Sequence, residues 1–343
     1  MSLLEIRGLT TEFKTEQGTV KAVRGIDYTV EKGEILGIVG ESGSGKSVGM
    51  LSLMGLLADN GRVVSGTINF DDRDITPSGL DTRGKKKAYD AKMRAIRGKD
   101  IGMIFQDPMS YLNPVLTIGR QITEAILCHE KCGRKEVNER AIKLMDMVGI
   151  PSPESRLKQY PFEFSGGMRQ RIIIAIALAC NPKLVIADEP TTALDVTVQA
   201  QILDLIKDCT KTSETGVILI THDLGVVASM CDRISIMYGG NIVEEGGTDE
   251  IFYSAAHPYT KGLLNSISNS DSDRKEPLKP IPGTPPDLLT WKSGCPFAPR
   301  CTETMEICTL YDPLTTRLSD THKCRCWQYC ADRYEEVLGK GDL

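Results

Sequence analysis

One glycine-rich stretch constrains the fold more than any other part of the sequence. It follows an apolar run at residues 35–39 and precedes a helix-forming run at residues 48–54. The order of apolar strand, glycine-rich turn and helix is the context in which G-x-x-x-x-G-K-S/T indicates a phosphate-binding loop. The stretch consists of Gly40, Glu41, Ser42, Gly43, Ser44, Gly45, Lys46 and Ser47.

The residue types in this loop suit a nucleotide. The glycines allow successive backbone N–H groups to converge on phosphate oxygens at a helix N-terminus. Lys46 is placed to reach the β- and γ-phosphates, and Ser47 to offer its hydroxyl to Mg2+. The alternative is a glycine-rich turn whose lysine is only solvated, which the strand and helix on either side disfavour. The sequence therefore predicts a nucleotide site in an α/β fold.

Bulk properties limit the class of protein. The 343 residues allow one large domain and a small one, and 41% hydrophobic with 25% charged residues is ordinary for a globular chain. A net charge of -5 argues against nucleic acid as a partner. The apolar run at residues 172–180 is too short to span a membrane, and the first residues lack signal-peptide character. We expect a cytoplasmic protein whose membrane role depends on a partner.

Acidic residues follow a second buried strand, predicted at residues 184–187. Four apolar residues between polar ones are typical of a central parallel strand. Asp188 is placed to hold Mg2+, and Glu189 to polarise the water that attacks the γ-phosphate. The alternative is that the two acids cap a helix. His222 follows another apolar run, at residues 216–221, and can hydrogen-bond the γ-phosphate.

A block at residues 109–180 is predicted to be mostly helical, because apolar positions recur three and four apart. It indicates a helical subdomain at about residues 108–180. Near its end, Ser165 is predicted to cap a helix whose first residues, Gly166 and Gly167, leave backbone N–H groups uncovered. These three residues fit a second anion-binding device, although alone they also fit a simple helix start.

The first residues predict a small antiparallel sheet, because residues 3–39 alternate apolar and polar positions in short bursts. Phe13 lies on one of these strands, where it either stacks on an adenine or packs within the sheet. The basic run at residues 85–87 is predicted to lie on a solvated loop or helix face.

Taken in order, these motifs resemble the nucleotide-binding cassette of ABC transporters over about residues 3–255. The resemblance identifies a phosphate loop at residues 40–47, a Q-loop glutamine, a signature, a Walker B aspartate, a D-loop and a switch histidine. The last five are Gln106, residues 164–168, Asp188, Asp195 and His222. Phe164 and Met168 depart from the family's Leu-Ser-Gly-Gly-Gln signature, but Ser165 and the backbone N–H groups that contact phosphate are retained.

The resemblance implies a P-loop NTPase fold: a RecA-like mixed sheet core, an antiparallel β subdomain and a helical subdomain. It also implies that ATP is hydrolysed in a composite site. One subunit binds ATP and Mg2+. In that subunit the resemblance implies that the metal is held by Ser47, Gln106 and Asp188, and that the adenine base is held by Phe13. The implied catalytic residues are Glu189, His222 and Gln106. Ser165, Gly166 and Gly167 of a facing subunit close over the γ-phosphate.

The C-terminal third narrows the family. The sequence His-Pro-Tyr-Thr-Lys-Gly-Leu-Leu at residues 257–264, a proline-rich linker at 266–294 and a cysteine-rich extension at 295–343 look like the tail of ATPases from dipeptide, oligopeptide and nickel importers. The cassette is then expected at residues 1–265. The resemblance implies the ATPase subunit of a dipeptide or oligopeptide importer, and the alternative is the ATPase subunit of a nickel importer.

That resemblance implies partners and a location. They are two integral-membrane permease subunits, a second homologous ATPase subunit, and an extracytoplasmic peptide-binding protein that acts indirectly. The pair of ATPases is expected as a heterodimer in the cell, and a homodimer is possible for the isolated chain. The protein is expected to be peripheral, at the cytoplasmic face of the membrane.

Cysteines crowd into the tail, where six of the eleven lie between residues 295 and 330. In a reducing compartment such a group more often binds metal than forms disulfides. In the resembling family this spacing is associated with a 4Fe-4S cluster, whose implied ligands are Cys295, Cys301, Cys308 and Cys326. Cys324 and Cys330 are alternatives for the fourth ligand, and Zn2+ or free thiols are alternatives to the cluster.

Three other classes of protein fit the sequence less well than a transport ATPase. A DNA-repair or chromosome-structuring ATPase would carry long heptad runs between its motifs, and none is present. A tandem-cassette translation factor would carry a second phosphate loop, and the sequence has one. An iron-sulfur redox protein with a regulatory ATPase would need a cluster that cycles reversibly. A non-transport ABC ATPase is thus the less favoured reading.

Overall fold

The structure is a computed structural model that describes residues 2–105, 111–191, 196–266 and 280–330. The chain divides into two compact units. The first comprises Met1–Leu4, Thr29–Ile35 and Phe70–Ile220, and the second comprises Glu5–Tyr28, Leu36–Asn69 and Thr221–Leu343. Two of the expected site residues, Gln106 and Asp195, lie outside the described residues.

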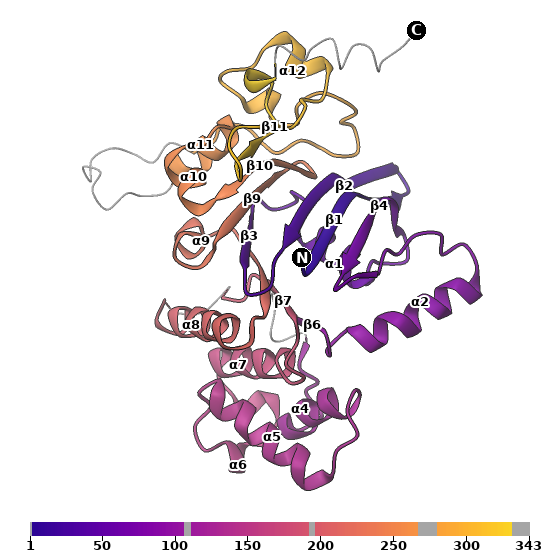
Figure 1. The fold of residues 1–343 in the computed structure, drawn as a ribbon, viewed down its shortest axis with the longest axis vertical. Helices are drawn as coiled ribbons and strands as arrows, with labels where there is room; N and C mark the ends of the chain where they lie inside the picture. Colours follow the sequence, from indigo (N-terminus) through magenta and orange to yellow (C-terminus); the bar gives the residue numbers. More distant parts are fainter. Residues whose placement is uncertain (1, 106–110, 192–195, 267–279, 331–343) are drawn as a thin grey trace. The chain divides into compact units, whose positions relative to one another are not determined.

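The second unit is built on two sheets (Figure 1). In one sheet, β2 (Gly18–Val30), β1 (Leu4–Thr15) and β4 (Gly61–Phe70) are neighbours in that order. In the other, β3 (Ile35–Val39) runs parallel to β9 (Arg233–Tyr238), and β9 pairs antiparallel with β10 (Asn241–Gly247). All five residues of β3 are buried, which explains its continuous apolar sequence. Helix α1 (Lys46–Met54) follows β3 after a short loop.

Residues 280–330, called the C-terminal segment below, extend this second sheet. Strand β12 (Lys323–Cys324) pairs antiparallel with both β10 and β11 (Thr316–Arg317). The remaining elements of this half are α9 (Leu224–Met230), α10 (Thr248–Tyr253), α11 (Pro258–Asn265), α12 (Glu306–Leu310) and the 3-10 turns η2 (Ala298–Arg300) and η3 (Trp327–Tyr329). The sequence analysis predicts no strand in this segment, because strands of two residues carry no periodicity.

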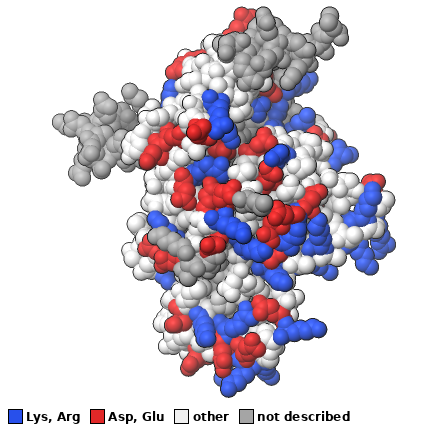
Figure 2. All heavy atoms as spheres, in the orientation of Figure 1, with Lys and Arg blue, Asp and Glu red and all other residues white. Residues whose placement is uncertain are grey.

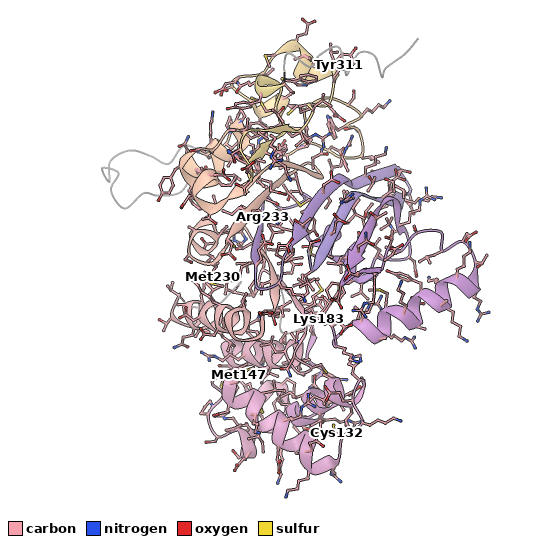
Figure 3. The ribbon with its side chains drawn as sticks, viewed as in Figure 1. Cys132, Met147, Lys183, Met230, Arg233 and Tyr311 are labelled. Atoms are coloured by element: carbon pink, nitrogen blue, oxygen red, sulfur yellow. The ribbon has the colours of Figure 1, made fainter. Side chains whose placement is uncertain are left out.

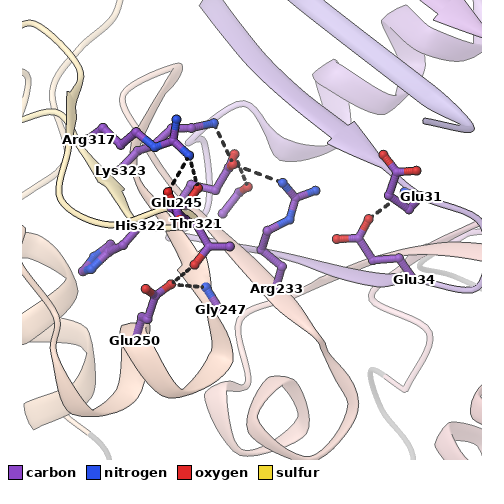
Figure 4. Close-up of polar contacts among 12 residues, drawn as sticks. Glu31, Glu34, Arg233, Glu245, Gly247, Glu250, Arg317, Thr321, His322 and Lys323 are labelled. Atoms are coloured by element: carbon purple, nitrogen blue, oxygen red, sulfur yellow. Dashed lines mark hydrogen bonds and ion pairs between the residues drawn. The ribbon is translucent and has the colours of Figure 1, made fainter. Parts of the chain in front are cut away.

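Polar contacts attach the C-terminal segment to β10 and α10 (Figure 4). The Glu245 carboxylate accepts hydrogen bonds from Arg233 and from Lys323, each at 3.2 Å. Glu250 accepts from the Thr321 hydroxyl at 2.7 Å and from the Gly247 N–H at 2.8 Å. Glu245 is buried, so removal of either cationic partner would leave part of its charge uncompensated.

Three parallel strands form the centre of the first unit. Strand β7 (Leu184–Asp188) runs parallel to β6 (Ile101–Ile104) and to β8 (Gly216–Thr221). Strands β7 and β8 confirm the buried runs that the sequence predicts at residues 184–187 and 216–221. Helix α8 (Val196–Ser213) and the short strand β5 (Arg73–Asp74) complete this part.

Helices gather beyond these strands, as predicted for residues 109–180. They are α4 (Ile118–Leu127), α5 (Arg134–Met147), α6 (Pro153–Arg156), the turn η1 (Pro161–Glu163) and α7 (Gly166–Ala177). Ile126, Val137 and Ala179 form a buried cluster among them. Figure 3 labels Cys132 and Met147 in this group.

The basic run predicted to be solvated lies on α2 (Arg83–Ile96). Only Met93 and Ile96 of this helix are buried, and Lys and Arg side chains lie exposed along it (Figure 2). Across the described residues, no helix combines the length and the apolar character needed to cross a membrane.

Candidate nucleotide site and a thiol-lined cavity

The loop between β3 and α1 has a backbone that requires glycine. Gly43 and Gly45 have φ values of 78° and 100°, in the left-handed region that favours glycine. A Cβ at Gly45 would lie 2.4 Å from the Ala22 carbonyl oxygen, and a Cβ at Gly40 would lie 2.2 Å from that of Met237. Side chains at these positions would displace the loop, so the glycines are needed for its course.

Lys46 lies over the loop that precedes it. Its Nζ donates hydrogen bonds to the carbonyl oxygens of Gly40 at 2.7 Å and Glu41 at 3.0 Å. Only 8% of the residue is exposed. A buried ammonium needs strong acceptors, and phosphate oxygens would supply stronger ones than carbonyls do.

Glu41 makes contacts through both its backbone and its side chain. Its N–H donates to the Tyr259 hydroxyl at 3.0 Å, and its carbonyl accepts from Lys46. Its carboxylate accepts two hydrogen bonds from Arg300, at 2.7 and 3.1 Å. Arg300 and the role of Tyr259 could not be predicted from the sequence, because 259 positions separate Arg300 from Glu41 and no local pattern joins them.

The acidic pair lies at the end of β7, in the first unit. Asp188 is 7% exposed. Glu189 has φ of 47°, which is uncommon for a residue with a side chain. The Glu189 N–H donates to the Ile220 carbonyl at 2.9 Å, and the Gln170 amide donates to the Pro190 carbonyl at 2.7 Å. Both bonds hold the turn that carries Glu189, so the carboxylate is carried on a fixed and strained backbone.

Ser165 caps α7, as the sequence predicts. Its Oγ accepts a hydrogen bond from the Met168 N–H at 3.4 Å. Ser165 and Gly166 are exposed, whereas Phe164 is 3% exposed and lies under the Arg156 guanidinium. A Cβ at Gly167 would lie 3.0 Å from Val198 Cγ1. The helix start is therefore presented to solvent, while Phe164, one of the two residues that depart from the family's signature, is packed inside.

The other predicted site residues are placed as follows. His222 is exposed directly after β8, and Asp223 caps α9 by accepting from the Gly225 N–H at 2.8 Å. Phe13 lies on β1 and is partly buried, and a Cβ at Gly61 would lie 2.6 Å from its ring. The ring therefore packs over Gly61, and its stacking on an adenine stays a prediction.

Four thiols line one cavity in the C-terminal half of the second unit. They belong to Cys295, Cys301, Cys308 and Cys326, and His257 and Trp327 also line it. Cys324 and Cys330 are buried but are not among the lining residues. Burial raises the pKa of Cys295 to about 12 and that of Cys326 to about 11. Within the described ranges, no group of three or more His, Cys, Asp or Glu residues is arranged so that it could hold a metal ion.

The loops that bring the thiols together are tied by backbone hydrogen bonds. The Cys295 N–H donates to the Cys308 carbonyl at 2.7 Å, and Trp327 Nε1 donates to the carbonyl of Tyr311, labelled in Figure 3, at 2.9 Å. Trp327 is 1% exposed and packs with Cys308. The cavity thus has its own small core.

Comparisons with known proteins agree with these observations. Residues 23–192 match the family described as ABC transporter, and residues 243–308 match the one described as oligopeptide/dipeptide transporter, C-terminal region. A solved dimeric bacterial ABC transporter cassette, MJ0796, has a TM-score of 0.61 at 27% identity and covers 71% of this chain and 98% of its own.

Two curated relatives from Bacillus subtilis (strain 168) match nearly the whole chain. The oligopeptide transport ATP-binding protein OppD is 51% identical over 326 residues, which are 95% of this chain and 88% of the relative. The dipeptide transport ATP-binding protein DppD is 51% identical over 341 residues, which are 99% and 98% of the two chains. The chain belongs to the family of oligopeptide and dipeptide transport ATP-binding proteins of ABC transporters.

Proposed function

We propose that this chain is the ATP-hydrolysing subunit that powers a peptide importer. The observation that carries the proposal is the glycine-dependent loop with Lys46 folded over it, in a chain 51% identical over nearly its full length to two peptide-transport ATP-binding proteins. Dipeptides and oligopeptides are favoured as cargo over nickel, because the relatives are named for peptides.

Each residue of the nucleotide site has a chemical part in this proposal. Lys46 and the loop N–H groups would hold the β- and γ-phosphates, and Phe13 the base. Ser47 and Asp188, with Gln106, would hold Mg2+, which neutralises phosphate charge when bound. Glu189 would orient and polarise the attacking water, and His222 would contact the γ-phosphate. Such catalysis works chiefly by positioning and charge stabilisation.

A second subunit completes the site in our proposal. Ser165, Gly166 and Gly167 would close over the γ-phosphate bound by a facing ATPase subunit, and the exposure of this helix start supports that role. Two permease subunits would receive the resulting motion, and an extracytoplasmic peptide-binding protein would deliver the cargo. The chain would then be peripheral, at the cytoplasmic face of the membrane.

The test is whether ATP hydrolysis responds to the permease. The chain is coexpressed with its permease and second ATPase subunit, purified as a complex and compared with the chain alone. We expect copurification, and hydrolysis that rises when the peptide-binding protein and a peptide are added, with Lys46→Ala as the inactive control. A chain that copurifies with no permease, and whose hydrolysis ignores one, would contradict the proposal.

We propose, in addition, that the thiol-lined cavity is the site of a 4Fe-4S cluster with a structural role, in a small cysteine-rich C-terminal extension. Four cysteine thiols and no carboxylate except that of Glu303 line the cavity, a donor set that suits iron-sulfur. The cysteine spacing lacks the paired C-x2-C knuckles common in structural zinc sites, which favours iron-sulfur over zinc. The cavity volume is about 10 Å3, roughly one water, so the thiols would move outward on binding.

Metal analysis of anaerobically purified protein tests this second proposal. We expect about four iron and four sulfide per chain, and iron loss in Ser variants of each of Cys295, Cys301, Cys308 and Cys326. The matched controls are Cys324→Ser and Cys330→Ser, whose buried thiols lie outside the cavity lining. One zinc and no iron, or equal iron loss in the controls, would overturn it.

A further inference from the structure

Arg300 is fixed more tightly than a surface arginine would be. Its side chain is 5% exposed. Besides the two bonds to Glu41, Nη1 donates to the Tyr238 hydroxyl at 3.1 Å and Nε to the Pro282 carbonyl at 2.8 Å. Every nitrogen of the guanidinium is therefore engaged, which holds the plane in one orientation.

The paired hydrogen bonds between Arg300 and Glu41 make the position of the Glu41 carboxylate depend on that of the Arg300 guanidinium. Two parallel N–H···O bonds between a guanidinium and a carboxylate fix both direction and distance. Because the Arg300 side chain is buried, loss of Glu41 would strand its charge, and the pair resists separation. The hydroxyl of Tyr259, at the start of α11, accepts a hydrogen bond from the backbone N–H of Glu41. Glu41 is thus held from two elements outside the phosphate loop.

Neither contact belongs to the nucleotide motifs. Arg300 ends η2 in the C-terminal segment, and Tyr259 lies in the His-Pro-Tyr stretch that opens α11. The loop they hold must keep its N–H groups convergent to bind phosphate. A shift of Glu41 moves the next residues of the loop, since the Ser44 N–H donates to the Glu41 carbonyl at 3.2 Å.

We propose that Arg300 is a positioning residue for ATP: it holds Glu41, and through it the phosphate loop, in the shape that receives the β- and γ-phosphates. The C-terminal segment is then part of the nucleotide-binding apparatus. This inference rests on ATP binding by the chain and is independent of the proposed cluster, and iron content is measured in the same samples to keep the two distinguishable.

The experiment measures the ATP dissociation constant of the full-length chain by calorimetry. Arg300→Ala is expected to weaken ATP binding about tenfold or more, the loss of a charge-assisted hydrogen-bond pair. Arg300→Lys, which keeps the charge without the paired bonds, is expected to lie between Arg300→Ala and the unmodified chain. The matched control is Arg325→Ala. Arg325 lies in the same segment and donates to Asn241 Oδ1 at 2.9 Å and, within the segment, to the Pro313 carbonyl at 2.9 Å. Neither of these two partners belongs to the phosphate loop.

A double-mutant cycle with Glu41→Ala separates positioning from mere attachment of the segment. If Arg300 acts through Glu41, Arg300→Ala should weaken ATP binding little further in a Glu41→Ala background. Thermal unfolding and iron content of every variant are recorded, so that a loss of fold or of cluster is recognised. Equal ATP affinity of Arg300→Ala and Arg325→Ala, or additive effects of Arg300→Ala and Glu41→Ala, would overturn the proposal.

Discussion

At the level of single residues, the strained backbone of Glu189 lowers the stability of the chain while its carboxylate serves the proposed hydrolysis. A φ near 50° in a residue with a Cβ costs about 1–2 kcal/mol, and Glu189 adopts 47°. Glycine accepts that conformation without strain but costs about 0.5–1 kcal/mol in chain entropy. Glu189 therefore makes this turn less stable than glycine would, but it supplies the carboxylate that the proposed hydrolysis needs.

We predict opposite effects of Glu189→Gly on stability and on activity. The free energy of unfolding should rise by up to about 1 kcal/mol because strain is relieved. ATP hydrolysis by the assembled transporter should fall about a hundredfold or more, because the water loses its base. Urea unfolding and phosphate release measure the two effects.

Glu214 provides the matched control for this prediction. It has nearly the same backbone angle, φ of 51°, but lies in an exposed turn of the first unit. Glu214→Gly should bring the same gain in stability with unchanged hydrolysis. Unchanged hydrolysis in Glu189→Gly as well would show that Glu189 is not the catalytic base.

At the scale of elements, α11 depends on a neutral histidine. His257 Nδ1 accepts from the Tyr259 N–H at 3.1 Å and so caps the helix. Burial lowers the pKa of His257 to about 3, and Lys261 on the same helix adds to the effect. The buried Glu244 carboxylate accepts from the His257 N–H at 3.0 Å and pairs with His322 at 2.7 Å. The helix start thus holds Tyr259, and its hydroxyl, in place.

This depressed pKa predicts a dependence of stability on pH. Unfolded histidine titrates near 6.5, so between about pH 6.5 and pH 3 the unfolded chain binds a proton that the folded chain excludes. The stability that neutral His257 contributes is therefore fully present at pH values above the pKa of the unfolded histidine. It is lost as the pH falls below that pKa toward the lowered pKa of the folded state. Lowering the pH from 7 to 5 should cost about 2 kcal/mol from this group.

Urea unfolding at pH 7, 6 and 5 measures this slope. His257→Asn keeps a capping acceptor and removes the titration, so it should be less sensitive to pH than the unmodified chain. His257→Ala should also lose about 1 kcal/mol at pH 7 with the cap. An equally steep decline in His257→Asn would mean that other groups set the acid sensitivity.

At the scale of the whole molecule, sequence predicts what is local and misses what is distant. The strand, loop and helix around Lys46 were predictable because one continuous pattern encodes them, and so were the buried strands β7 and β8. The Arg300 contact with Glu41 was not, because it joins residues 259 positions apart. Strands β11 and β12 were missed because they are two residues long and depend on pairing with β10.

The same distant contact links the thiol-lined cavity to the nucleotide loop. Cys301 directly follows Arg300, and its N–H donates to the Ala298 carbonyl at 3.2 Å within the same turn. We predict that Cys301→Ser, which should lose the cluster, also weakens ATP binding several-fold, in the manner of Arg300→Ala. Calorimetry on protein of measured iron content checks this, with exposed Cys128→Ser as control. Iron loss in Cys301→Ser with unchanged ATP affinity would show that the cavity does not influence the phosphate loop, and would contradict this prediction.

If ATP hydrolysis at this site drives peptide import, the import can be measured as uptake into vesicles. Proteoliposomes hold the chain, its second ATPase subunit and the permease, with the peptide-binding protein and either labelled dipeptide, labelled oligopeptide or radioactive nickel outside. We expect ATP-dependent accumulation of peptide that is lost with Lys46→Ala. Accumulation of nickel alone, or peptide uptake that persists with Lys46→Ala, would contradict it.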